Sequence, residues 1–299
     1  MAKTKILILG ASGMIGNTLF RKLSQSRKYE VFGTVPNETQ EKLIAEKYKK
    51  QIFNHIEIEN FDSVIRVVEV ARPSIVINCV GLIKQMSNAN DLPVAIYMNA
   101  LFPHRLAHLL SAANVRLIHL STDCVFSGIT GYYYEKDLTD ATDTYGKTKF
   151  LGEVTNYKNC LTLRTSCIGH ELQGYKGIVE WFLSQSGSTW GYRKAIYSGV
   201  PTVELAEILT KFIIPNHQLS GLYHVSAEPI NKNDLLNLIA KEYKKKIKIK
   251  PDDKEVVDRS INSDRFRKKT GYKPPTWNAL IKKMHKDYAS SHIYRKYES

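Results

Sequence analysis

The sequence lacks the features that mark secreted, disulfide-rich and membrane-spanning proteins. Its four cysteines, Cys79, Cys124, Cys160 and Cys167, form neither a CxxC pair nor a cluster with histidine at zinc spacing, which predicts no disulfide framework and no metal site. No apolar run approaches the roughly 18 residues that a membrane span needs, and residues 1–5 lack a secretory apolar stretch. We therefore expect a cytoplasmic protein with no membrane partner, whose cysteines are reduced and mostly buried.

Acidic residues are scarce beside basic ones, with 29 against 43 and a formal net charge of +14. Residues 241–299 hold 18 Lys and Arg against 8 Asp and Glu, so most of the excess is local. The stretch 241–250 (KEYKKKIKIK) is typical of a solvated face that contains an alternating strand, and a polyanionic ligand or an acidic partner is the alternative. We expect no nucleic-acid partner, because no recognised motif and no interleaving of aromatic and basic residues accompanies the charge.

From residue 5 to about 170, short apolar runs alternate with amphipathic stretches, which predicts an α/β fold with a doubly wound parallel sheet. The predicted strands are 5–9, 30–35, 75–80, 116–120 and 161–163, and the predicted helices are 15–24, 61–70, 101–113 and 145–154. The chain then becomes irregular, with further helices expected at 204–213, 232–243 and 277–288. We expect a main domain over 1–170 and a smaller C-terminal α/β lobe over 171–299, part of which returns to the main domain.

The first predicted strand (KILIL, 5–9) runs directly into the turn GASGMIG over 10–16 and then into a helix. Glycines let the backbone approach a pyrophosphate, whose charge meets free amides at the positive end of the helix. This context favours a Rossmann-type NAD(P)-binding domain over a plain strand–helix turn. The residues expected to contact the cofactor here are Gly10, Ser12, Gly13, Met14, Ile15 and Gly16.

The choice between NADP and NAD depends on the end of the second predicted strand. An acidic residue there would hold a ribose 2′-hydroxyl, and none stands in 34–36 (TVP). We therefore expect NADP, with NAD as the alternative, because Glu38 in the following loop could take the acidic role.

The strongest chemical signal is Tyr145 followed four residues later by Lys149 on a predicted helix. This spacing puts the phenol and the ammonium on one face, and the ammonium is expected to lower the phenol pKa from its ordinary value of about 10 toward neutrality. Thr122, at the end of a central strand, is expected to face the same crevice, with a strand-end cap as the alternative. A second YxxxK match, at Tyr132, lies in a Gly- and Tyr-rich loop with no helix to align it.

Five segments together resemble the dTDP-4-dehydrorhamnose reductase branch of the extended short-chain dehydrogenases: residues 10–16, 78–81 (NCVG), 121–126 (STDCVF), 145–149 and 163–166 (LRTS). The resemblance spans nearly the whole chain. It implies hydride transfer to the C4 ketone of a nucleotide-activated 6-deoxy sugar in surface polysaccharide biosynthesis. Tyr145 would protonate the alkoxide, Lys149 would bind the nicotinamide ribose and Thr122 would orient the carbonyl.

The resemblance also implies further contacts. Cofactor contacts are expected at Glu57, Ile58, Cys79, Val80, Gly81, Asn99 and Thr165. Substrate contacts are expected at Asp123, Val125, Phe126, Trp181, Arg193, Ser198, Val200 and Arg259, where Arg259 would pair with a diphosphate and Trp181 would stack on a base. Simpler roles stay open, with Asn99 as a helix cap, Trp181 as a core residue and Arg259 as a surface residue.

Departures from the family pattern leave the substrate open. Cys124 stands where sugar-nucleotide dehydratases carry a glutamate and many rhamnose-pathway reductases a tyrosine, so a dehydratase is not expected. Residues 78–85 (NCVGLIKQ) and 258–261 (DRSI) also differ from the rhamnose enzyme, which makes a UDP-linked 2-acetamido-2,6-dideoxy sugar a second candidate.

The competing hypothesis is a non-catalytic NADP-binding regulatory subunit that resembles the β-subunit of methionine adenosyltransferase. The joint presence of Thr122, Tyr145 and Lys149 favours the enzyme, because a regulatory subunit has no need of a proton-transfer group. Homo-oligomerisation is compatible with either hypothesis.

Overall fold

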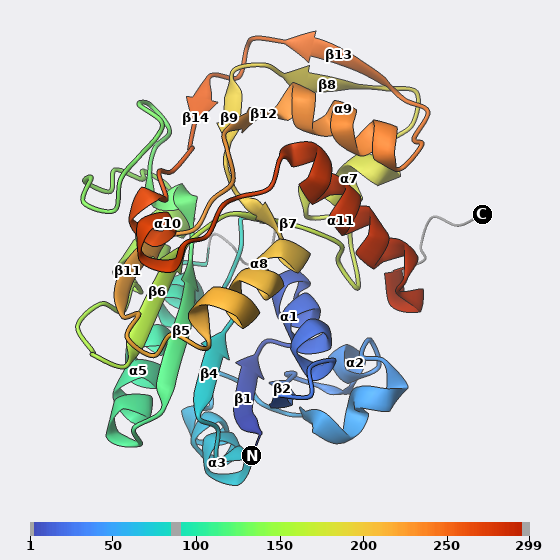
Figure 1. The fold of residues 1–299 in the computed structure, drawn as a ribbon. Helices are drawn as coiled ribbons and strands as arrows, with labels where there is room; N and C mark the ends of the chain where they lie inside the picture. The colour runs from blue at the N-terminus through green and yellow to red at the C-terminus, as the bar shows by residue number, and fades with distance from the viewer. Residues whose placement is uncertain (1–2, 85–90, 295–299) are drawn as a thin grey trace.

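A seven-stranded parallel sheet forms the centre of the molecule (Figure 1) in the computed structural model, which describes residues 3–84 and 91–294. The strand order is β11-β6-β5-β4-β1-β2-β3. The strands are β1 (Thr4–Leu9), β2 (Tyr29–Thr34), β3 (Ile52–Phe53), β4 (Ile75–Asn78), β5 (Arg116–Ser121), β6 (Cys160–Arg164) and β11 (Gly221–His224). This order confirms the predicted Rossmann-type fold and places the switch point, where such sheets bind ligands, between β1 and β4.

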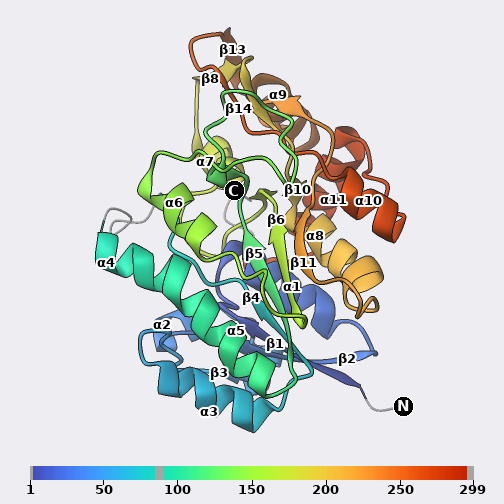
Figure 2. The same cartoon turned by 90° about the vertical axis from the view of Figure 1, so that its left-hand side faces the viewer.

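Helices cover both faces of the sheet (Figure 2). On one face lie α3 (Phe61–Ala71), α5 (Phe102–Ala112) and α6 (Thr144–Leu151), and on the other lie α1 (Met14–Ser24), α8 (Thr202–Ile208) and α11 (Trp277–Ala289). Successive residues of a strand point to opposite faces. Ile6 and Ile8 of β1 therefore enter one apolar core, and Leu7 and Leu9 enter the other. A strand buried on both faces is continuously apolar, which is why β1 was predictable.

The predicted elements correspond closely to the observed ones, with most ends within one residue. The helix predicted over 204–213 begins at Thr202 and becomes a π-helical turn after Ile208. Two further ends differ for local reasons. The strand predicted over 75–80 ends at Asn78, whose Oδ1 accepts a hydrogen bond from the Val80 amide at 3.1 Å and turns the chain out of the sheet. The helix predicted over 145–154 ends at Leu151. A Cβ at the following Gly152 would lie 1.8 Å from the Asn99 carbonyl oxygen, so this glycine allows close packing on a neighbouring helix.

A smaller lobe lies beyond the carboxyl ends of the strands (Figure 1). It contains α7 (Ile178–Ser184), α9 (Lys232–Glu242), a three-stranded sheet of β12 (Ile230–Asn231), β9 (Ala195–Tyr197) and β14 (Val257–Asp258), and a pair formed by β8 (Ser188–Tyr192) and β13 (Lys248–Asp252). The basic stretch 241–250 thus runs into β13. The chain between these pieces supplies α8 and β11 to the main sheet layer.

The remaining elements connect these layers. They are α2 (Glu38–Glu41), α4 (Leu92–Ala95), a π-helical turn (Ile96–Leu101) that leads into α5, the paired strands β7 (Cys167–Ile168) and β10 (Val200–Pro201), a second π-helical turn (Leu209–Ile213) that continues α8, α10 (Asp264–Thr270), and short 3-10 helices at Glu46–Gln51, Asp123–Val125 and His292–Tyr294. The four cysteines are free; Cys160 is buried, whereas the other three are only half-buried. No helix in residues 3–84 and 91–294 is both long enough and apolar enough to cross a membrane.

Buried charges fasten α11 to α1. Arg21 Nη2 donates hydrogen bonds to Asp287 Oδ2 at 2.7 Å and to the Tyr294 hydroxyl at 3.2 Å, and that hydroxyl donates to Asn17 Oδ1 at 3.1 Å. Burial opposes ionisation of Asp287, but hydrogen bonds from Arg21 and Lys22 hold its pKa below the ordinary value. The helix that follows the glycine turn therefore depends on a residue 266 positions away.

Candidate active site

The glycine turn leaves the start of α1 open to an anion. Gly10 directly follows β1 with φ of +81°, and a Cβ at Gly16 would lie only 2.0 Å from the Gly10 carbonyl oxygen. The first turn of α1 can therefore pack on this loop only with glycine at residue 16. Within the described chain no side chain caps α1, and its first turn has no acidic residue. The free amides and the positive helix end fit a cofactor pyrophosphate.

Neighbouring residues complete the expected cofactor path. Ser12, Met14 and Ile15 are half-buried around the turn, and the Gly10 amide donates to Thr34 Oγ1 at 3.2 Å. Thr34, at the end of β2, thus holds the turn in place.

The loops after β3 and β4 extend this path. Glu57 is exposed and Ile58 is buried, and the Tyr97 hydroxyl fixes the Ile58 carbonyl at 2.8 Å. Cys79, Val80 and Gly81 are half-buried. Gln85, the last residue of the 78–85 motif, lies outside the described residues.

Thr122, Tyr145 and Lys149 converge where β5 ends and α6 begins. Thr122 Oγ1 accepts a hydrogen bond from the Cys124 amide at 3.1 Å and donates to Asp123 Oδ1 at 3.1 Å. The half-buried Tyr145 has its phenol beside this hydroxyl. Lys149, one turn further along α6, is buried, and its Nζ donates to the Leu120 carbonyl at 2.7 Å. Thr122 therefore caps a turn and also faces the phenol.

The electrostatics of this group differ from the sequence expectation. Burial raises the pKa of Tyr145 above its ordinary value, and the charges of Asp123 and Asp143 add to the effect. Burial also lowers the pKa of Lys149 to about 8. The prediction that Lys149 brings the phenol pKa toward neutrality is wrong for the chain alone, because the ammonium is turned to the Leu120 carbonyl and burial dominates. The phenol is therefore protonated at neutral pH.

Asn99 joins the loop after β4 to α6. Its Oδ1 accepts from the Leu82 amide at 2.8 Å, and its Nδ2 donates to the Leu82 carbonyl at 3.0 Å and to Thr148 Oγ1 at 3.2 Å. The side chain is buried and engages these groups instead of capping a helix near residue 101. It supports the helix that carries Tyr145 and Lys149.

A buried ion pair that was not predicted from the sequence joins Arg164, at the end of β6, to Glu153, just after α6. Arg164 Nε and Nη2 donate to the two carboxylate oxygens of Glu153 at 2.7 and 2.8 Å, and Ser121 Oγ donates to Glu153 at 2.7 Å. The available signal was an arginine at the end of an apolar strand (CLTLR, 160–164), because a buried guanidinium needs a partner. Thr165 follows, buried, with no hydrogen-bond partner for its hydroxyl among the described residues.

Four residues expected to contact the substrate lie in the interior. Val125 and Phe126 are fully buried in a cluster with Tyr133 and Ile261. Ser198 Oγ accepts from the Ile261 amide at 2.9 Å, and Val200 is fully buried. The side chains of these four residues (Val125, Phe126, Ser198 and Val200) shape the wall behind the site and are not open to a ligand in this structure.

Arg259 and Asp123 lie near Tyr145. Arg259 is half-buried, its Nε donates to the Phe126 carbonyl at 3.1 Å, and its charge acts on both Asp123 and Asp143. Asp123 is buried, and burial raises its pKa. A guanidinium at this position can receive an anionic group of a substrate.

Trp181 and Arg193 lie on the smaller lobe. The Lys232 ammonium is 4.7 Å from the centroid of the half-buried Trp181 ring. Arg193 is exposed and donates two hydrogen bonds to Asp253 at 2.8 and 2.7 Å, beside the β8–β13 pair. The Arg193 guanidinium is therefore occupied by the Asp253 carboxylate in this structure.

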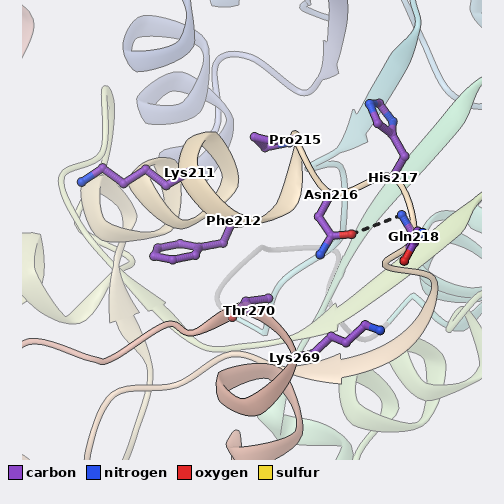
Figure 3. A pocket seen from close by; sticks show the side chains of 8 residues that line it. All are labelled: Lys211, Phe212, Pro215, Asn216, His217, Gln218, Lys269 and Thr270. Atoms are coloured by element: carbon purple, nitrogen blue, oxygen red, sulfur yellow. Dashed lines mark hydrogen bonds between the residues drawn. The ribbon is translucent and has the colours of Figure 1, made fainter.

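A hollow of about 500 Å³ lies elsewhere (Figure 3). It is lined by Lys211, Phe212, Pro215, Asn216, His217, Gln218, Lys269 and Thr270. Residues 215–218 precede β11, so the hollow lies at the edge where the parallel strands begin, away from Tyr145. The described residues also contain no group of three or more His, Cys, Asp or Glu side chains placed to hold a metal ion.

Comparison with known proteins identifies the family. Residues 4–290 match the RmlD substrate binding domain family. A dTDP-4-dehydrorhamnose reductase of Aggregatibacter actinomycetemcomitans is 26% identical over 240 residues, which cover 75% of this chain and 74% of that protein. The spore coat polysaccharide biosynthesis protein SpsK of Bacillus subtilis (strain 168) is 30% identical over 231 residues, which cover 75% of this chain and 73% of that protein.

A solved structure shows the same fold. The dTDP-4-dehydrorhamnose reductase of Bacillus anthracis, crystallised in complex with NADP, gives a TM-score of 0.78 at 20% identity, over 96% of this chain and 100% of that chain. The family match extends through both the glycine turn and the smaller lobe. This chain belongs to the RmlD substrate binding domain family.

Proposed function

We propose that this chain is an NADPH-dependent reductase of the 4-keto group of a nucleotide-activated 6-deoxy sugar, acting in polysaccharide biosynthesis. The observation that carries the proposal is the convergence of Thr122, a protonated Tyr145 and Lys149 at the sheet edge where α1 presents its open start. The names of the relatives, a dTDP-4-dehydrorhamnose reductase and a spore coat polysaccharide protein, support this substrate class. A bound nicotinamide cofactor would supply the hydride.

The residues of the chain supply binding and the proton. Tyr145 keeps its proton at neutral pH and donates it to the ketone oxygen as negative charge develops there. Thr122 presents its hydroxyl beside that phenol, and its single hydrogen, which points to Asp123 in this structure, would turn to the same oxygen and orient it. Lys149 uses one hydrogen on the Leu120 carbonyl, and an ammonium has three, which leaves donors for the hydroxyls of a ribose. The amides in the first turn of α1 would hold the pyrophosphate.

The cofactor is expected to be NADP, because β2 ends at Thr34 with its hydroxyl engaged by the glycine turn and no carboxylate at the strand end. The competing regulatory subunit is less well supported. Asn99, Glu153 and Arg164 all brace the helix and strands that carry Thr122, Tyr145 and Lys149, an arrangement that serves proton transfer.

The direct test is an assay of NADPH consumption with dTDP- and UDP-linked 4-keto-6-deoxy sugars, including the 2-acetamido form. We expect turnover with at least one of them, and a product in which the 4-keto group has become a hydroxyl, as shown by mass spectrometry. Folded protein that binds NADPH but reduces none of these sugars would contradict the proposal.

Cofactor affinity is expected to fall as pH rises through about 8. Burial lowers the pKa of Lys149 to about 8, so the ammonium that binds the ribose and attracts the phosphates is present below that pH and is lost above it. Fluorescence titration with NADPH on both sides of this value measures the effect. Lys149→Arg should flatten the profile because its guanidinium stays charged. A wild-type dissociation constant that does not change across the range contradicts the assignment.

Arg259→Met is expected to raise KM for the sugar nucleotide about 10- to 100-fold with little change in kcat, because charge-assisted bonds to a diphosphate hold substrate and transition state alike. Arg193→Met is the matched control, since that guanidinium is exposed and tied to Asp253. Steady-state kinetics on both variants decide the point. Equal KM values in the two variants would remove Arg259 from the substrate site.

A further inference from the structure

A second pair of charges links the loop after β4 to the start of α6. Lys84 Nζ lies 2.8 Å from Asp143 Oδ2, although 59 positions separate the two residues. Asp143 is also the N-cap of α6, because its Oδ1 accepts from the Gly146 amide at 2.9 Å. One carboxylate thus sets where the helix begins and also pairs with a cation from the loop after β4.

Tyr145 lies between two points at which α6 is bonded to other parts of the chain. Before it, Asp143 is held by Lys84. After it, Thr148 is held by Asn99, which also binds the Leu82 main chain. The same loop therefore fixes α6 on both sides of the phenol. A helix as short as α6 has little stability of its own, so its position depends on these tertiary contacts.

The Lys84–Asp143 ion pair contributes little to the free energy of folding. The side chains of Lys84 and Asp143 are 37% and 41% exposed, and an exposed ion pair of this kind contributes about 0–1 kcal/mol to folding. Its location is more informative. Lys84 Nζ lies 5.7 Å from the centroid of the Tyr145 ring, and the charge of Asp143 is one of those that act on the phenol.

We propose that Lys84 is a positioning residue for proton transfer: through Asp143 it holds the start of α6 so that the Tyr145 phenol stays beside the Thr122 hydroxyl. The inference rests on the proposed function, because the proton transfer it serves is that of the reductase. Lys84 acts through Asp143 and does not need to touch the substrate.

The test is a double-mutant cycle in the full chain with Lys84→Met, Asp143→Asn and both together. Asparagine keeps an oxygen that can accept from the Gly146 amide, so this variant removes the ion pair and preserves the helix cap. We expect each single variant to lower kcat about tenfold, as misplacement of a reacting group does, with KM within about twofold. The double variant should be no worse than either single one, and Lys84→Arg should restore most of the rate.

Lys147→Met is the control, because Lys147 is an exposed lysine on the same helix and should leave kcat unchanged. The proposal would be overturned if the two single losses of kcat multiply in the double variant, if KM rises at constant kcat, or if Lys84→Met leaves kcat unchanged. If the wild-type chain reduces no nucleotide sugar, the proposed function fails, and amide hydrogen exchange over residues 144–151 tests Lys84 separately. Exchange should be faster in Lys84→Met than in wild type, and equal rates would overturn the positioning role.

Discussion

Replacing Tyr145 by phenylalanine is expected to lower kcat about 10³-fold, within the range that general acid catalysis contributes, and to leave NADPH affinity near the wild-type value. The substitution removes only the hydroxyl, so the ring can keep its packing at the start of α6. Without the phenol, the proton donor beside Thr122 is lost, because Asp123 accepts the Thr122 hydrogen bond and the Lys149 ammonium is turned to the Leu120 carbonyl. Steady-state rates and fluorescence titration with NADPH measure the two quantities.

Tyr132→Phe provides the matched control for this prediction. Tyr132 has the same YxxxK spacing but is 48% exposed in the loop before α6, where no helix aligns it with Lys136. Its replacement is expected to leave kcat unchanged. Equal activity of the Tyr145 variant and the wild-type chain would show that the proton comes from elsewhere, and the enzymatic assignment of this corner would have to be abandoned.

Gly16→Ala is expected to weaken NADPH binding at least 100-fold and to lower the free energy of unfolding by about 1–3 kcal/mol, the usual effect of overpacking. The added Cβ would lie 2.0 Å from the oxygen and 2.9 Å from the carbon of the Gly10 carbonyl. Both are backbone atoms, so the turn must open and the amides at the start of α1 must move. Isothermal titration with NADPH and chemical denaturation measure the two effects.

Gly13→Ala separates crowding from a general cost of losing glycine. Its φ is −72°, and an added Cβ would meet nothing closer than the Gly10 oxygen at 3.5 Å, an ordinary contact. Its stability is therefore expected to stay within about 1 kcal/mol of wild type. Two variants with equal unfolding free energies would refute the steric argument for Gly16.

Local patterns made the fold and the centre of the site predictable. β1 is continuously apolar because it is buried on both faces, and its junction with Gly10 is contiguous in sequence. Tyr145 and Lys149 are one turn apart, so their shared face follows from helical geometry alone. Each of these features is encoded in one contiguous segment. The 500 Å³ hollow at the opposite sheet edge is formed by two distant segments, and no sequence pattern predicted it.

Long-range contacts explain what the sequence could not show. Lys84 meets Asp143, and Arg259 meets the Phe126 carbonyl across 133 positions; no local spacing encodes either pairing. The pKa of Tyr145 depends on burial by the assembled fold, which overrides the neighbouring lysine. Phe126 follows the motif residue Thr122 closely, yet its ring stacks on Tyr133 at a centroid distance of 4.1 Å. A residue within a sequence motif can therefore have a packing role only.

The attachment of α1 by Arg21, Asp287 and Tyr294 bears on how the protein matures during synthesis. The glycine turn is synthesised long before its support, because Arg21 gains its buried counter-ion only once residue 287 has been added, and Asn17 gains the Tyr294 phenol only after that. A nascent chain that already contains both the glycine motif and the Tyr145 pair still holds an unneutralised charge beneath its first helix. We therefore expect capture of the dinucleotide to follow the synthesis of residues 287–294, which complete the support of α1.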